Sequence, residues 1–231
     1  MNISRALVWQ TVVPAMCLPF IASLLYFVLF SEYAFSRIIY GGTKLFTLVW
    51  PIAAFLLIYK TRLPKLNLRD SIHPKAIPFG LLVGFGIAGL MFGLMQTPIG
   101  AVVQEGGANI AQKTTELGVL DHFWTFAIFI SIFHSLLEEY FWRWFVFGRL
   151  RQLLSFWPAH LLGGAAFAAH HIVITTQFSP SAWGVFFGSM VGVGGVIFSL
   201  LYERQKTLAG AWVAHMAVDF GIMAIGHNVI S

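Results

Sequence analysis

The sequence predicts an all-α fold, a polytopic bundle of about seven transmembrane helices. Hydrophobic residues make up 58% of the 231 residues and charged residues only 10%, with a mean hydropathy of +0.79. This composition differs from that of a soluble domain, where about a quarter of the residues are charged. The apolar runs are close to the length of about 20 residues that a bilayer requires. They are apolar on all faces, whereas a membrane β-barrel would alternate apolar and polar residues.

The first apolar run has little of the charged start and no clear small-residue cleavage site of a signal peptide, so we expect it to be a retained span. No internal repeat or long linker divides the chain. The predicted spans are residues 7–30, 41–59, 77–99, 122–147, 157–175, 182–202 and 207–229. Between the third and fourth spans, the polar stretch Gln104–Asp121 is expected to be a connector or a short surface helix.

The distribution of Lys and Arg predicts a cytoplasmic N-terminus and, with seven spans, a C-terminus outside. In this arrangement only three basic residues lie on the outer side: Arg37, Lys44 and Lys113. We expect an integral protein of a bacterial inner membrane, whose constant partner is the lipid bilayer. The cytoplasmic segments would hold Arg5, Lys60, Arg62, Lys65, Arg69, Lys75, Arg149, Arg151, Arg204 and Lys206.

The net charge of +5 does not indicate nucleic-acid binding, because the basic residues fall in loops between apolar runs, where topology explains them. The single cysteine, Cys17, allows neither an intrachain disulfide nor a thiolate metal site. Nucleic acid is therefore not expected as a partner.

Ionisable residues inside the predicted fourth span are the first candidates for chemistry, since such groups are costly in a membrane and usually functional. His134, Glu138, Glu139 and Arg143 occur within one apolar run. Residues four apart share a helix face, so Glu139 can pair with Arg143, and His134 can lie beside Glu138. Glu138 is then the carboxylate that is free for another role.

Two later spans carry further ionisable residues. The fifth span holds Phe167, His170 and His171, and the seventh places His215 four residues before Asp219. Each of these residues alone, His134 included, has a simple structural explanation: a histidine can serve in packing, and an acid and a histidine can hydrogen-bond only to each other. Together they are more numerous than an inert bundle requires. Three other histidines lie near predicted membrane boundaries and are set aside: His122, His160 and His227.

Aromatic residues follow the two glutamates along the fourth span, and we expect them to be a packing or lipid-facing surface rather than a ligand site. They are Tyr140, Phe141, Trp142, Trp144, Phe145 and Phe147.

Three short motifs in these spans resemble a known family. E-E-Y-F-W-R (138–143) fits E-E-x-x-x-R, F-A-A-H-H (167–171) fits F-x-x-x-H, and H-M-A-V-D (215–219) fits H-x-x-x-(N/D). In this order on separate spans, they resemble the CPBP family of intramembrane proteases, which groups CAAX prenyl endopeptidases with bacterial bacteriocin-processing and Abi proteins. The resemblance covers about residues 120–225. It implies a division into N-terminal spans and loops (1–119) and a catalytic core (120–231) within one structural unit.

The resemblance implies an endopeptidase that cleaves a membrane-associated protein or peptide. Glu138 matches the family's catalytic glutamate, which activates water together with the histidine matched by His171. Glu139 and Arg143 match positions that shape the site.

The last motif of the family implies an oxyanion-stabilising role for His215 and Asp219. Many members have asparagine where this chain has Asp219, and the aspartate can instead orient His215. His170 is an adjacent competitor for the role of His171, which the motif register prefers.

Two alternatives use the same residues. Glu138, His171 and His215 form a ligand set compatible with a catalytic zinc ion that keeps one position open for water, so the cofactor is expected to be either absent or zinc. A proton- or ion-coupled transporter would use the buried acids and histidines as a relay, although the chain lacks the doubled halves common in transporters. A catalytically silent scaffold is a third possibility.

Overall fold

The computed structural model describes residues 3–64, 71–116 and 118–231, and this part of the chain contains helices and no strand. The expected all-α fold is therefore confirmed. Among the described residues, six helices are long and apolar enough to cross a membrane: Arg5–Leu29, Ser36–Ile58, Ile72–Leu94, Leu120–Leu153, Ser181–Gln205 and Leu208–Ile230. The remaining expected span is helix α9 (Phe156–Thr175), which has 20 residues but a lower hydropathy because it contains three histidines.

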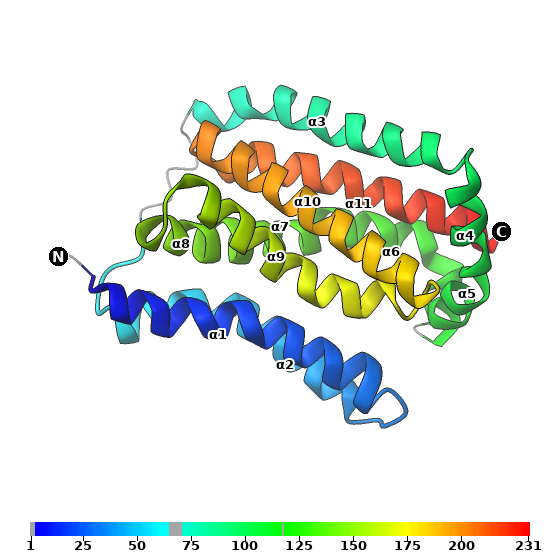
Figure 1. Ribbon diagram of the computed structural model, residues 1–231, viewed down its shortest axis with the longest axis horizontal. Helices are drawn as coiled ribbons and strands as arrows, with labels where there is room; N and C mark the ends of the chain where they lie inside the picture. Colours follow the sequence, from blue (N-terminus) through cyan, green and yellow to red (C-terminus); the bar gives the residue numbers. More distant parts are fainter. Residues whose placement is uncertain (1–2, 65–70, 117) are drawn as a thin grey trace.

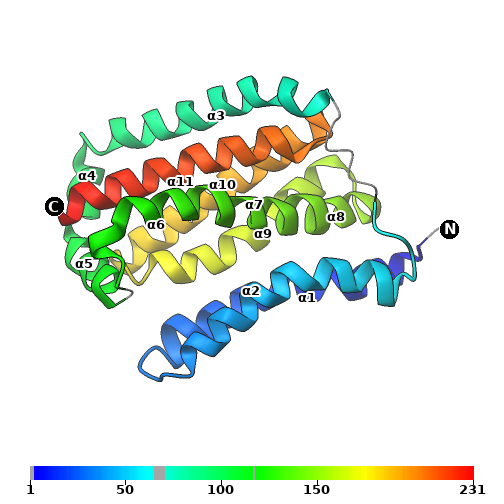
Figure 2. The same ribbon diagram turned by 180° about the vertical axis from the view of Figure 1, so that it is seen from behind.

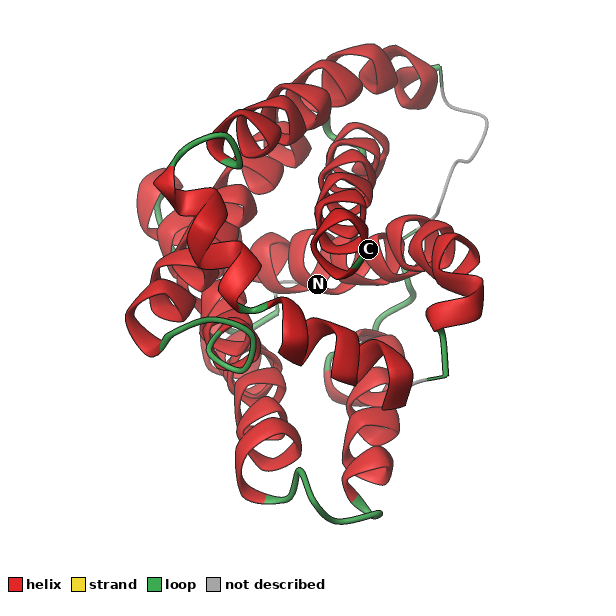
Figure 3. Cartoon of the chain, turned by 90° about the vertical axis from the view of Figure 1, so that its right-hand side faces the viewer, coloured by secondary structure: helices red, strands yellow, loops and turns green. Residues whose placement is uncertain are grey.

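The long helices lie side by side along the longest dimension of the molecule (Figure 1). α1 (Arg5–Leu24) and α2 (Ser36–Ala53) form a hairpin on one side of the bundle, and α3 (Ile72–Leu94) lies on the other side against α11 (Leu208–Ile230). The view from behind shows the same order (Figure 2), and the end-on view shows the hairpin projecting from the bundle (Figure 3). Between them lie the fourth span (Leu120–Leu153), α9 and α10 (Ser181–Gln205).

The fourth span is one continuous helix that begins with a 3₁₀ turn and then alternates between α-helical and π-helical segments. Its segments are η3 (Leu120–His122), α6 (Phe123–Phe129), η4 (Ile130–His134), α7 (Ser135–Glu138), η5 (Glu139–Phe147) and α8 (Gly148–Leu153). The π-helical segments η4 and η5 flank α7. Such segments are rare and often occur at functional sites, because each extra residue per turn re-aims the side chains. η1 (Leu25–Leu29) and η2 (Ala54–Ile58) end the first two spans in the same way.

Two short helices, α4 (Pro98–Glu105) and α5 (Gly107–Glu116), lie between the third and fourth spans at the end of the bundle that carries the C-terminus. The polar stretch Gln104–Asp121, expected as a connector or a short surface helix, contains α5. α4 begins with Thr97 as its N-cap, whose hydroxyl accepts a hydrogen bond from the Ile99 amide, and with Pro98 in its first turn.

The two chain ends lie at opposite ends of the bundle (Figure 1). The basic residues expected to be cytoplasmic lie at or near helix ends on the N-terminal side, apart from Lys65 and Arg69, which fall outside the described residues. The sidedness of the membrane stays a prediction. Lys44, which was counted with the outer basic residues, lies more than two turns inside α2 and within a candidate membrane span.

The aromatic residues of the fourth span form a packing surface. Phe141 and Phe145 are fully buried, and Trp142 and Phe147 nearly so, within a core that also contains Val8 of α1. Tyr140 and Trp144 are half-buried and stack on one another. The fourth span is therefore held against the N-terminal hairpin by aromatic contacts.

Helices α9 and α10 approach closely because small residues line their contact. A Cβ atom added at Gly188 would lie 2.5 Å from the Ile172 Cα and 2.6 Å from its amide nitrogen, so no side chain fits there. Close packing of this kind is a common way for membrane helices to associate. It fixes the position of the histidines on α9.

The substitution Gly188→Ala is expected to destabilise the protein by about 1–3 kcal/mol, because the added methyl group must push apart two packed backbones. Gly194→Ala is the matched control on the same helix, since a Cβ there would meet only the Phe198 ring at 3.9 Å. Thermal unfolding in detergent measures both. Equal melting temperatures for the two variants would contradict this account of the α9–α10 contact.

Candidate active site

The four ionisable residues of the fourth span form two pairs, as their spacing predicts. His134 Nε2 lies 3.2 Å from Glu138 Oε1, and Arg143 Nη1 lies 3.0 Å from Glu139 Oε1. Glu139 is fully buried and Arg143 is 2% exposed. The second pair is thus shielded from solvent, whereas Glu138 borders a cavity.

Arg143 is enclosed by aromatic rings as well as by its carboxylate partner. The guanidinium carbon lies 4.5 Å from the centre of the Phe167 ring and 5.2 Å from that of Phe198. A guanidinium is attracted to the face of an aromatic ring. Arg143 therefore joins the fourth span to α9 and α10, and it offsets the charge of Glu139.

His215 of α11 connects three carboxylates. Its Nδ1 lies 2.8 Å from Glu139 Oε1, and its Nε2 lies 3.4 Å from Asp219 Oδ1 and 3.7 Å from Glu138 Oε2. The His215–Asp219 pair expected within one helix is present, but the shortest contact of His215 is with Glu139. A carboxylate only accepts hydrogen bonds, so Nδ1 carries the proton that it donates to Glu139.

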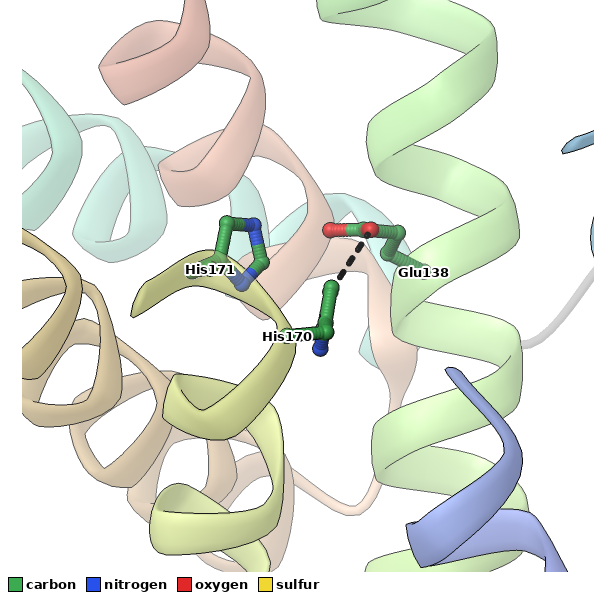
Figure 4. A group of neighbouring side chains, drawn as sticks. All are labelled: Glu138, His170 and His171. Atoms are coloured by element: carbon green, nitrogen blue, oxygen red, sulfur yellow. Dashed lines mark ion pairs between the residues drawn. The ribbon is translucent and has the colours of Figure 1, made fainter. Parts of the chain in front are cut away.

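The two adjacent histidines of α9 both approach Glu138 (Figure 4). His170 Nε2 lies 3.9 Å from Glu138 Oε1, and its ring stacks on Trp142 with a centroid distance of 5.4 Å and an interplanar angle of 4°. His171 Nδ1 lies 2.9 Å from the Phe167 carbonyl oxygen and donates to it. The Nε2 atom of a neutral His171 then has a free lone pair.

One group of side chains among the described residues meets the geometric requirement for a metal site. One possible ligand atom from each of Glu138, His170 and His171 lies within 4.8 Å of the other two. His215, expected as a ligand, is not in this group, and its Nδ1 is bonded to Glu139. The metal-binding set that the geometry offers therefore contains both α9 histidines.

A cavity of about 210 Å³ lies in front of Glu138, His170 and His171. Its opposite wall is formed by the N-terminal hairpin, including Ser23 of α1 and Lys44 of α2. Because the cavity is partly polar and large enough for several water molecules, water can reach the carboxylate. The cavity is thus enclosed by the hairpin on one side and by the fourth span and α9 on the other.

Sequence reasoning missed the part of the site that comes from α2. Lys44 Nζ lies 3.0 Å from His134 Nδ1, which connects the hairpin to Glu138 through an imidazole. The signal that could have found it was a lone lysine within the predicted second span, since the argument from membrane depth applies to it as well. His134 itself is a direct neighbour of Glu138.

The three histidines set aside do not line the cavity. His122 and His227 lie near the end of the bundle that carries the C-terminus, where the His227 ring lies against Trp124. His160 is fully buried at the opposite end, 3.0 Å from Glu203 and 2.6 Å from the Ser199 hydroxyl. This second polar cluster holds α9 to α10.

Fold and site together define a polytopic helical membrane protein with a cluster of carboxylates and imidazoles inside its bundle. Residues 120–221 match the family model described as type II CAAX prenyl endopeptidase Rce1-like. The chain is also 33% identical over 147 residues to the membrane-embedded CAAX protease MroQ of Staphylococcus aureus, a match that covers 61% of this chain. The chain spans about half, 54%, of that relative's length. No solved structure matches the chain significantly. Both matches are to CAAX proteases, the class of membrane protein that the three motifs resemble.

Proposed function

We propose that this protein is an intramembrane endopeptidase that hydrolyses a peptide bond of a membrane-associated protein or peptide. One observation carries the proposal: the Glu138 carboxylate borders a cavity inside the bundle and lies 3.2, 3.7 and 3.9 Å from the imidazoles of His134, His215 and His170. The names of the matched family and of the S. aureus relative support the same reaction class.

Glu138 is the general base in this proposal. A water molecule in the cavity donates one hydrogen bond to the carboxylate and the other to the free Nε2 of His171, which leaves its lone pairs directed at a substrate carbonyl. Attack transfers one water proton to Glu138, which later returns it to the leaving amine. A positioned base of this kind contributes about 10²- to 10⁴-fold to a rate.

His215 stabilises the oxyanion that develops on the carbonyl through its positive charge. With protons on both ring nitrogens, which lie against Glu139 at Nδ1 and Asp219 at Nε2, the ring is a cation 3.7 Å from the Glu138 carboxylate, and a positive charge at this position favours the transition state. Asp219 orients the imidazole. Arg143 offsets the charge of Glu139, so that Glu139 can hold His215 without a large local excess of negative charge.

The same residues fit a zinc ion by their chemistry. Glu138, His170 and His171 would hold it, and when bound it would supply Lewis acidity and a more acidic water. The glutamate–histidine reaction requires only these side chains and a water molecule, and we propose it without a metal.

The proposal is tested with the purified full chain in proteoliposomes. Two sets of fluorescence-quenched peptides are offered, one ending in a farnesylated cysteine followed by three residues and one consisting of unlipidated transmembrane segments. We expect mass spectrometry to detect cleavage of at least one set, and cleavage to persist in 1,10-phenanthroline. Loss of cleavage that zinc restores would replace the metal-free reaction with the zinc one. A pH-gradient-driven flux without any cleavage would support the transporter alternative instead.

A further inference from the structure

Lys44 is a basic residue within a candidate membrane-spanning helix, and the proposed reaction does not use it. It lies more than two turns inside α2, and it lines the cavity opposite the α9 histidines. Its Nζ is 3.0 Å from His134 Nδ1 and 5.4 Å from the centre of the Tyr40 ring. A lysine within a membrane span is costly and usually functional.

The contact with Lys44 determines which nitrogen of His134 carries the proton. An ammonium group has three donors and no acceptor, so the hydrogen bond requires an unprotonated Nδ1 on His134. The proton of the neutral ring is then on Nε2, which lies 3.2 Å from Glu138 Oε1 and donates to it. Lys44 thus selects the imidazole tautomer that can bind the carboxylate.

We propose that Lys44 is a positioning residue for Glu138 and acts through His134. The inference rests on the proposed function, because it assigns Glu138 the role of the base. The hydrogen bond from His134 holds Oε1 of Glu138 and leaves Oε2 for the attacking water. The N-terminal hairpin therefore contributes to the site, although it lies outside residues 120–221, which match the family model.

The position of Lys44 agrees with this role better than with a packing role. Its side chain is only partly buried and borders the polar cavity. A methionine would fill the same volume among apolar neighbours without the cost of placing a charge in the membrane. The presence of a charged side chain at residue 44 is explained if its hydrogen bond to His134 is needed to position Glu138.

The test compares Lys44→Met with Lys44→Arg in the full chain. We expect Lys44→Met to lower kcat by about 10- to 100-fold, the usual effect of a misplaced catalytic group, with little change in KM or melting temperature. Lys44→Arg should restore much of the loss, because a guanidinium also donates without accepting. Arg37→Met is the matched control: this exposed basic residue of α2 does not line the cavity and should leave turnover unchanged.

A double-mutant cycle with His134→Phe tests whether Lys44 acts through the imidazole. In the His134→Phe background, Lys44→Met should cause no further loss of kcat. Full activity of Lys44→Met, or losses that simply multiply in the double variant, would overturn the assignment. Glu138→Gln is measured in parallel, so that failure of the proposed function can be told from failure of the Lys44 assignment. An active Glu138→Gln variant overturns the proposed function. An inactive Glu138→Gln variant together with a fully active Lys44→Met variant overturns only the role of Lys44.

Discussion

The substitution Glu138→Gln is expected to lower kcat by about 10²- to 10⁴-fold, the contribution of a positioned general base. The amide keeps the size of the side chain and still accepts a hydrogen bond from His134, but it cannot take a proton from water. The protein should therefore insert and purify normally. Peptide cleavage in proteoliposomes, followed over time at saturating substrate, measures the effect.

A matched control is available at the other polar cluster of the bundle. Glu203 is also mostly buried and lies 2.9 Å from Arg151 and 3.0 Å from His160, but it does not line the cavity. Glu203→Gln should lower the melting temperature and leave kcat near that of the unmodified chain. Equal losses of turnover in the two variants would assign the effect of Glu138 to folding rather than to the reaction.

The substitution Arg143→Met is expected to have the largest effect on stability, about 3–5 kcal/mol, as when one partner of a buried ion pair is removed. The Glu139 carboxylate, which is fully buried, then loses the cation that lies 3.0 Å away. His215, at 2.8 Å, would be its remaining charged neighbour. Thermal unfolding in detergent and the yield of monodisperse protein measure the loss.

A double variant, Glu139→Gln with Arg143→Met, distinguishes a lost charge balance from a lost packing contact. Replacing both members of a buried pair usually costs far less than removing one. We expect the double variant to recover most of the melting temperature while turnover stays low. The amide that replaces the Glu139 carboxylate is neutral, so it would still contact His215 but would no longer stabilise a positive charge on that imidazole. An Arg143→Met single variant as stable as the unmodified chain would contradict this account of the pair.

The parts of the site that depend on helical spacing could be predicted from the sequence. His134 with Glu138 and Glu139 with Arg143 are neighbours on one helix, so their spacing of four residues was sufficient. The all-α fold followed equally directly from the apolar runs.

Contacts between helices could not be predicted in the same way. The short contact between His215 and Glu139 joins α11 to η5, and no spacing in the sequence encodes it. Lys44 was assigned to the outer side because every basic residue was counted as a topology signal, although this one pairs inside the bundle. Both His170 and His171 approach Glu138, which the spacing of the motif alone did not indicate.

The most direct test of the central claim is an experimental structure of the full chain in a lipid nanodisc, at a resolution that shows ordered water. We expect a water molecule hydrogen-bonded to both the Glu138 carboxylate and His171 Nε2, with His215 facing the same space. A Glu138 side chain that points to the lipid, or that is separated from these imidazoles by more than one water molecule can bridge, would contradict the proposed reaction.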